Sequence, residues 1–78
     1  MNALQKLLDF LSKLHEHKIS YRLSNPREES IMAVIDVPGE RWEVEFFADG
    51  HVEVEVFKTT VEIEGEEALA RLFEKYSD

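Results

Sequence analysis

Residues 41–57 read RWEVEFF, ADG and HVEVEVF, and this stretch decides the fold. Apolar and polar residues alternate on both sides of the Asp49-Gly50 pair, which is typical of two antiparallel strands with one buried face. A two-residue loop would set valines opposite glutamates, whereas the three-residue loop 48–50, with glycine in the left-handed region, pairs Phe46 with Val52. We therefore predict the three-residue loop. The further pairs are then Val44 with Val54 and Trp42 with Val56.

The same register places four glutamates together on the outward face of the hairpin. Glu43 then lies beside Glu55, and Glu45 lies beside Glu53. Like charges directly opposite one another cost roughly 0.2–1 kcal/mol per pair, whereas each large apolar side chain buried on the inner face contributes about 1.5–3 kcal/mol. The apolar face therefore sets the register, and we expect an acidic outer surface on the sheet.

An amphipathic helix is expected ahead of the strands, from Ala3 to His17. Asn2 can cap it, and five leucines recur at helical spacing with polar residues between them. We expect this leucine stripe to lie in the core. Its members are Leu4, Leu7, Leu8, Leu11 and Leu14.

Two further strands are predicted between this helix and the hairpin. Residues Ile19–Ser24 alternate, and Ile31–Val37 is apolar at nearly every position, as in a strand with neighbours on both sides. The proline-containing segment Asn25–Glu29 is predicted to be a turn. We expect a four-residue loop, Pro38–Arg41, before the hairpin. It would pair Val37, Ile35 and Ala33 with Trp42, Val44 and Phe46, and would set Met32, Val34 and Asp36 beside Phe47, Glu45 and Glu43.

The chain ends in a second helix. Residues 61–63 form a short final strand or cover the sheet edge, and the acids at 64–67 stand at the start of the helix, where they complement its dipole. The apolar face of this helix consists of Ala68, Leu69, Leu72, Phe73 and Tyr76. The sequence thus predicts one α+β domain over residues 1–78, ordered α-β-β-β-β-(β)-α in two layers, with an antiparallel meander sheet and both helices on one face.

The net charge of −8 is concentrated in one part of the chain. Residues 40–67 contain ten acidic and two basic residues, whereas the charges elsewhere balance. This distribution argues against binding to nucleic acid or to an anionic membrane, and it permits attraction to a basic partner. Because the chain has no continuous apolar segment that would serve as a signal or a membrane span, we expect a cytoplasmic protein.

Residue types that carry chemistry are sparse and poorly placed. The chain has no cysteine, no nucleophile elbow and no phosphate- or dinucleotide-binding motif, so we predict no enzyme activity and no cofactor. His15 and His17 are two apart on a helix and point to different sides. A flat acidic sheet offers no loop carbonyls to complete a calcium site, so we predict no metal site either.

We predict instead a protein-binding surface on the outer face of the sheet. If apolar groups are exposed there among the acids and beside an arginine, they mark a contact surface; the alternative is that a helix or loop of the same monomer covers them. Two partners remain open: a basic protein docked on the acidic strands, and a second copy bound through Met32, Val34 and Phe47. The predicted surface consists of Arg22, Met32, Val34, Glu43, Glu45, Phe47, Glu53, Glu55 and Phe57.

The strand pattern also carries a resemblance. Residues 41–46, the Asp49-Gly50 turn, residues 52–57 and a helix containing Leu72-Phe73 resemble a group of small bacterial proteins of unassigned function. The resemblance covers the chain from about Tyr21 to its end. Some members are similar to immunity proteins encoded beside toxins, which implies an inhibitor role. Because the group has no established chemistry, the resemblance transfers no catalytic residue. Residues 58–60 depart from the Ser/Asp-Gly turn of that group.

Overall fold

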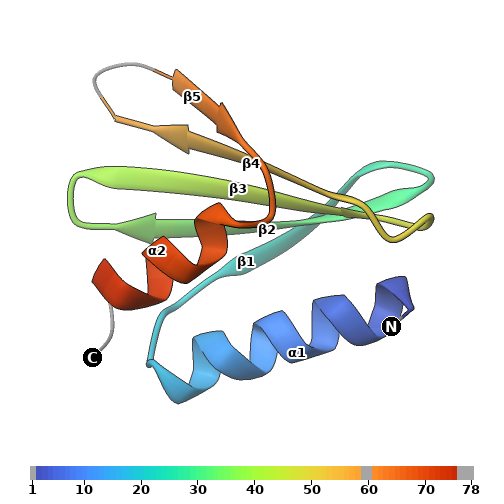
Figure 1. Cartoon of the computed structure of the whole chain (residues 1–78), viewed down its shortest axis with the longest axis horizontal. Helices are drawn as coiled ribbons and strands as arrows, with labels where there is room; N and C mark the ends of the chain where they lie inside the picture. Colours follow the sequence, from blue (N-terminus) through green and yellow to red (C-terminus); the bar gives the residue numbers. More distant parts are fainter. Residues whose placement is uncertain (1, 59–60, 76–78) are drawn as a thin grey trace.

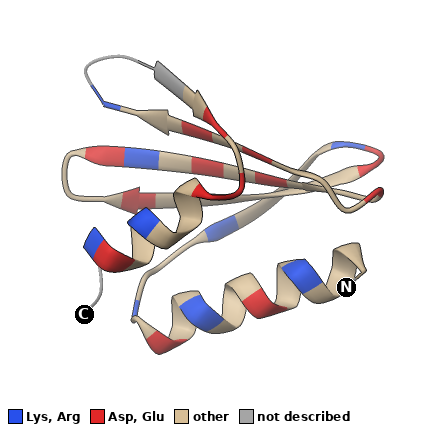
Figure 2. Cartoon of the chain, in the orientation of Figure 1, with Lys and Arg blue, Asp and Glu red and all other residues tan. Residues whose placement is uncertain are grey.

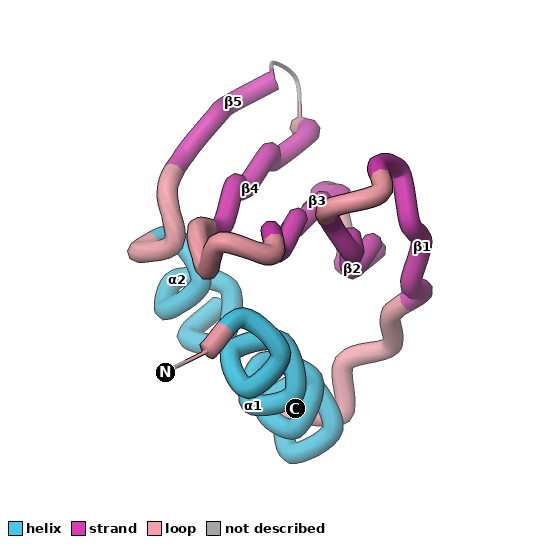
Figure 3. Tube along the Cα trace, turned by 90° about the vertical axis from the view of Figure 1, so that its right-hand side faces the viewer, coloured by secondary structure: helices cyan, strands magenta, loops and turns pink. Residues whose placement is uncertain are grey.

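Two helices pack on one face of a five-stranded antiparallel sheet in the computed structural model, which describes residues 2–58 and 61–75 (Figure 1). The strands follow one another across the sheet in the order β1-β2-β3-β4-β5. Figure 3 shows both helices on the same side of this sheet. The predicted α+β meander is therefore confirmed. The elements are α1 (Ala3–Glu16), β1 (Arg22–Arg27), β2 (Ser30–Val37), β3 (Glu40–Phe47), β4 (Val52–Phe57), β5 (Val61–Glu64) and α2 (Ala68–Lys75).

The hairpin of β3 and β4 has the predicted three-residue loop. Gly50 has a φ of 96°, in the left-handed region that favours glycine. The Phe47 amide donates to the His51 carbonyl at 3.0 Å, and the Gly50 amide donates to the Phe47 carbonyl at 2.9 Å. The predicted pairs of the hairpin are all present, namely Phe46–Val52, Glu45–Glu53, Val44–Val54, Glu43–Glu55 and Trp42–Val56.

The predicted register between β2 and β3 is wrong by two residues. The loop is the two-residue Pro38-Gly39, because proline presets its own backbone and Gly39 takes a φ of 78°, which together suit a type II turn. A shift of two leaves every side chain on its predicted face but changes its neighbours. The inward pairs are Ile35–Trp42, Ala33–Val44 and Ile31–Phe46, and the outward pairs are Asp36–Arg41, Val34–Glu43, Met32–Glu45 and Ser30–Phe47.

Strand β1 lies later in the chain than predicted. It begins at Arg22 rather than Ile19, and the predicted turn Asn25–Glu29 contributes its first three residues to the strand. The Asn25 side chain donates to the carbonyls of Arg27 and Ser30, each at 2.5 Å, and so closes the strand end around an irregularity in its register. Proline is tolerated here because β1 is an edge strand.

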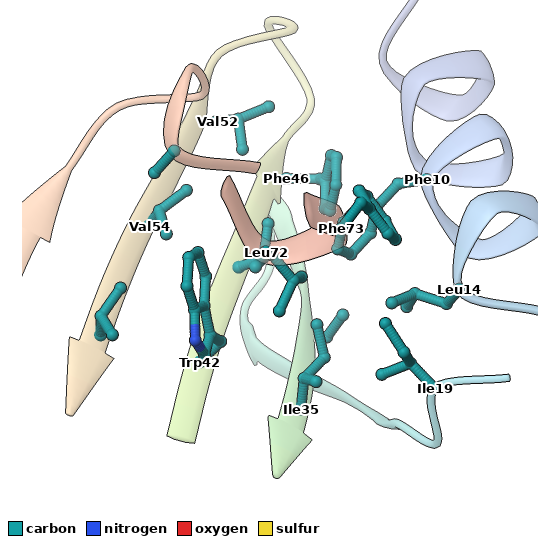
Figure 4. Packing of buried hydrophobic residues seen from close by; sticks show 14 residues of the cluster. Phe10, Leu14, Ile19, Ile35, Trp42, Phe46, Val52, Val54, Leu72 and Phe73 are labelled. Atoms are coloured by element: carbon teal, nitrogen blue, oxygen red, sulfur yellow. The ribbon is translucent and has the colours of Figure 1, made fainter. Parts of the chain in front are cut away.

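The core lies between the inner face of the sheet and the two helices (Figure 4). The Phe10 ring packs 5.3 Å from that of Phe46 and 5.7 Å from that of Phe73, so α1, β3 and α2 meet at one aromatic cluster. The buried cluster consists of Phe10, Leu14, Ile19, Ala33, Ile35, Trp42, Val44, Phe46, Val52, Val54, Val56, Ala68, Leu72 and Phe73.

The prediction that the whole leucine stripe of α1 lies in the core is wrong for two members. Leu4 and Leu8 are 63% and 48% exposed. The buried face instead centres on Phe10 and Leu14. The large ring of Phe10 packs on Phe46 of β3, so the side of the helix that carries Phe10 points into the core. Leu7 and Leu11 are half-buried against this core.

The last strand and the second helix complete the sheet and the core. Residues 61–64 pair with β4, so a final strand is present. Helix α2 buries Ala68, Leu72 and Phe73, and Leu69 is half-buried, as predicted. Tyr76, the last residue of the predicted apolar face, lies outside the described residues.

Glu40 links three parts of the fold. Its side chain is 5% exposed and accepts a hydrogen bond from the Trp42 indole nitrogen at 2.9 Å. Lys75 of α2 and Lys58 after β4 lie 3.1 and 3.5 Å from the same carboxylate. Trp42 is 1% exposed, so its N–H depends on this acceptor.

We expect Glu40→Ala to lower the free energy of unfolding by about 2 kcal/mol, because it leaves the buried indole N–H without an acceptor. Glu40→Gln keeps an acceptor oxygen and should cost less than about half of that. Urea denaturation followed by fluorescence of the single tryptophan measures both. Glu55→Ala, at a half-exposed position, is the control. Equal losses for Glu40→Ala and Glu40→Gln would contradict this role of the carboxylate.

Candidate interaction surface

The outer face of the sheet is the face that neither helix covers (Figure 3). Residues alternate along each strand, so the outward set follows from the observed pairings. All nine residues of the predicted surface lie on this face, since Arg22 pairs with Val34, Val34 with Glu43, and Glu43 with Glu55 across the sheet. What differs from the prediction is how many of them reach solvent.

Glu45 is an interior residue of this face rather than part of an open acidic surface. It is 5% exposed, and its Oε2 accepts from Ser30 Oγ at 2.5 Å and from Arg27 Nε at 3.0 Å. Ser30 is itself 4% exposed. The charge of Glu45 is therefore compensated within the monomer, as a buried carboxylate requires.

Sequence reasoning missed Ser30 and Arg27 in this cluster. Ser30 stands one residue before the predicted strand, and its even-numbered position shares the outward face of Met32, so alternation could have indicated it. No sequence pattern indicated Arg27, because residues 25–29 were expected to form a turn. The Arg27 side chain reaches Glu45 because the register of β1 is irregular at this end.

The other two arginines of the outer face are also paired with acids. Arg22 lies 3.4 Å from Asp36, and Arg41 lies 3.3 Å from Glu43. Glu55, by contrast, has no basic side chain within ion-pair distance in the part of the chain that the structure describes. Among these described residues, the ion-pair partner of Glu53 is the His51 ring, at 3.3 Å. Excess negative charge on this face thus lies on β4 (Figure 2).

The apolar members of the predicted surface are mostly covered. Val34 and Phe47 are 6% and 7% exposed, and Met32 and Phe57 are half-buried. Phe47 is covered by polar side chains: the Arg27 guanidinium lies 5.5 Å from its ring centroid, and the His51 ring stacks on it at 4.1 Å. The predicted alternative, cover by the same monomer, therefore holds for these two residues.

The most exposed large apolar side chain on the described surface is one that the sequence did not single out. Ile63 of β5 is 79% exposed and pairs with Glu55 across the strands. Strand alternation would have placed it beside Glu55 if residues 61–63 had been treated as a strand. An apolar group thus stands next to the uncompensated acids of β4.

The tip of the β3–β4 hairpin holds a histidine between two carboxylates. Nδ1 of His51 lies 2.6 Å from Asp49 Oδ1, and Nε2 lies 3.3 Å from Glu53 Oε2. The hydrogen bond with the Asp49 side chain raises the pKa of His51. The backbone N–H of His51 donates to the same carboxylate and, with the His51 side chain, lowers the pKa of Asp49. The protonated ring donates from both nitrogens and compensates part of the acidic charge at this end.

Neither a metal centre nor a catalytic pair is evident in the described residues. No group of three or more histidine, aspartate or glutamate side chains among them could hold a metal ion. Ser30 is hydrogen-bonded to a carboxylate, but both side chains are almost fully buried, so this contact is structural. No helix within residues 2–58 and 61–75 is long and apolar enough to cross a membrane.

Comparison with known proteins gives no match to a family model, to a curated protein or to a solved structure. The resemblance to small bacterial and immunity-like proteins therefore stays a prediction.

We expect Asp49→Asn to lower the pKa of His51 toward its usual value of 6.5, because the main cause of the upward shift is removed. An NMR titration of the His51 ring protons measures the change, and Asp9→Asn on α1 is the control.

The pH dependence of the hairpin tip follows from the signs of these shifts. Because folding raises the pKa of His51, its contribution is complete below about 6.5 and is lost as the pH rises through the folded pKa. Because folding lowers the pKa of Asp49, its contribution is present above about 3.8 and is lost as the pH falls through the folded pKa. The protection factors of the amides at the tip, which correct for the intrinsic pH dependence of hydrogen exchange, should be largest between these limits. An unchanged His51 titration in Asp49→Asn would contradict the assignment.

Proposed function

We propose that this protein is a cytoplasmic, non-enzymatic interaction domain that docks a basic protein partner on the β3–β4–β5 part of its outer sheet face, as an immunity or inhibitor protein would. The observation that carries the proposal is the uneven compensation of charge on that face. Each arginine of this face is paired with an acid, whereas Glu53 is exposed and Glu55 is half-exposed, and neither has an arginine or lysine partner among residues 2–58 and 61–75. A partner with a cationic surface would complement the charge of these two glutamates.

Apolar groups beside the acids support a specific contact. Ile63 is 79% exposed next to Glu55, and Phe57 is half-buried at the end of the same strand. Desolvated apolar area gives a complex its lifetime, whereas the net charge of −8 speeds the encounter with a basic partner. The exposed Ile63 and the acids of β4 lie toward the same edge of the sheet.

The second candidate, self-association through Met32, Val34 and Phe47, has less support. Val34 and Phe47 are already buried within the monomer and offer little area to a second copy. Such a pairing would also bring two acidic β4 strands toward each other.

The proposal is tested by reversing the charge of Glu53 and Glu55 to lysine. The fold should be retained, because the change removes like-charge pairs with Glu45 and Glu43. Basic products of reading frames next to the gene are the partners to screen first, by capture on the immobilised wild-type protein and then by stopped-flow binding. With the captured partner, we expect the association rate to fall at least about tenfold and to lose most of its salt dependence.

A matched control reverses Asp9 and Glu16 of α1 to lysine. This variant has the same net charge but keeps the outer sheet face, so its association rate should stay within about a factor of three of wild type. Equal losses in the two variants would show that net charge alone matters and would contradict a docking site on the sheet.

A further inference from the structure

Helix α1 carries a second apolar strip that the core leaves exposed. Leu4 and Leu8 are 63% and 48% exposed, and Leu11, one turn further on, is half-buried. Residues at such spacing lie along one side of a helix. Leu4, Leu8 and Leu11 thus form a continuous strip beside the buried face of Phe10 and Leu14, and we call it the leucine strip.

Contacts at both sides of α1 fix the direction of this strip. On one side, Lys6 pairs with Glu66 at 3.1 Å and the Lys13 ammonium lies 5.3 Å from the Phe73 ring, so that side faces α2. On the other side, His15, four residues after Leu11, meets Tyr21 just before β1, with Nε2 and Oη 3.0 Å apart. The leucine strip therefore faces β1 and not α2.

A groove adjoins the N-terminal end of the leucine strip. Leu23 on β1 pairs with the inward-facing Ala33, so it lies on the helix side of the sheet, and yet it is 50% exposed. A cavity of about 220 Å³ opens at the N-terminal end of α1; Leu4, Leu7 and Phe46 line it on one side, and the acids Glu28 and Glu29 also lie in its lining. Figure 3 shows that no helix lies between α1 and β1. Leu4 of the leucine strip thus borders this groove, and the exposed Leu23 of β1 lies on the same side of the sheet.

The charge on the α1 side of the molecule, beside the leucine strip, favours one kind of occupant. Residues 1–39 contain five acidic and five basic residues, whereas residues 40–67 carry the whole net charge of −8. The polar neighbours of the leucine strip on α1 include Gln5 and Ser12, both uncharged. A second copy can meet this side without bringing two acidic strands together, which it cannot do on the outer sheet face.

The order of the leucines adds a second argument for self-pairing. In an antiparallel pair of α1 helices with a two-fold axis between positions 7 and 8, Leu4 lies opposite Leu11 of the partner subunit, and Leu8 lies opposite Leu7 of the partner subunit. Each leucine of the strip then meets a leucine, as a two-fold interface requires of a self-complementary patch; the partner of Leu8 is Leu7, which is half-buried outside the strip but lines the groove. We propose that two copies of this chain associate through the leucine strip of α1 and the adjoining groove beside β1.

This inference is independent of the proposed function. The interface lies on the helix side of the sheet, and the acids of β4 lie on the other. A dimer formed in this way keeps both outer faces free and presents two docking surfaces.

Sedimentation velocity over a concentration series tests the proposal on the full chain. We expect a concentration-dependent dimer whose dissociation constant changes little with salt, because the contact is apolar. Leu8→Glu should raise that constant at least about 30-fold, since each protomer would bury a charge in place of a leucine. Helix α1 should still form, because glutamate is a good helix former and Leu8 is half-exposed.

Ile63→Glu is the matched control, because it replaces the most exposed large apolar residue at the far edge of the sheet. The dissociation constant of the Ile63→Glu dimer should equal that of the wild-type dimer. A monomer at every concentration would overturn the proposal, and so would a dimer that Ile63→Glu disrupts and Leu8→Glu does not.

Cross-linking gives a second readout, since the chain has no cysteine of its own. Under mild oxidation, Leu8→Cys should form a disulfide-linked dimer much faster than Ile63→Cys, although position 63 is more exposed in the monomer. Equal rates would contradict a two-fold contact near Leu8. The double variant Glu53→Lys/Glu55→Lys should dimerise as wild type does, so failure of this proposal is distinguishable from failure of the docking site.

Discussion

The pairing of β3 with β4 across the loop 48–50 is the constraint on which the rest of the structure depends. Because side chains alternate along a strand, this one loop decides that Trp42, Val44 and Phe46 lie under the sheet with the valines of β4. The helices then have an apolar face to pack on, and the glutamates between those residues are forced outward. The acidic outer surface is thus a by-product of the core. A loop one residue shorter would put glutamates against Phe10 and Leu72.

Alternation predicts which face a residue takes better than it predicts its neighbours or its exposure. The sequence predicted the faces of β2 correctly although the Pro38-Gly39 turn shifts its register by two, because a shift of two preserves parity. It could not predict that Glu45 is buried, since that depends on Arg27 reaching it from the far end of β1. Helical spacing also could not show that Phe10, and not Leu8, would be buried. Phe10 is buried because its ring packs on Phe46 and Phe73, which lie on distant segments of the chain.

Compensation within the monomer changes the character of the outer face. Four glutamates stand on it, but Ser30 and Arg27 hold Glu45, and Arg41 lies beside Glu43. Pairs at the surface contribute little stability, whereas an unpaired carboxylate in the position of Glu45 would cost more. The negative charge that no arginine compensates therefore lies on β4, next to the edge strand β5. At the hairpin tip, the protonated His51 ring partly neutralises the charge of Glu53, so the uncompensated acidic surface ends there.

The two sides of the molecule therefore suit different contacts. Edge strands invite pairing unless something blocks them, and β1 is blocked by Pro26 and an irregular register, whereas β5 has only its short length and its acids. Glutamates at an edge repel another copy of the same edge but not a basic chain. On the helix side, the leucine strip has little charge to repel anything. The two proposed contacts, a basic partner on the outer face and a second copy on α1, are compatible with each other, because neither requires the other surface.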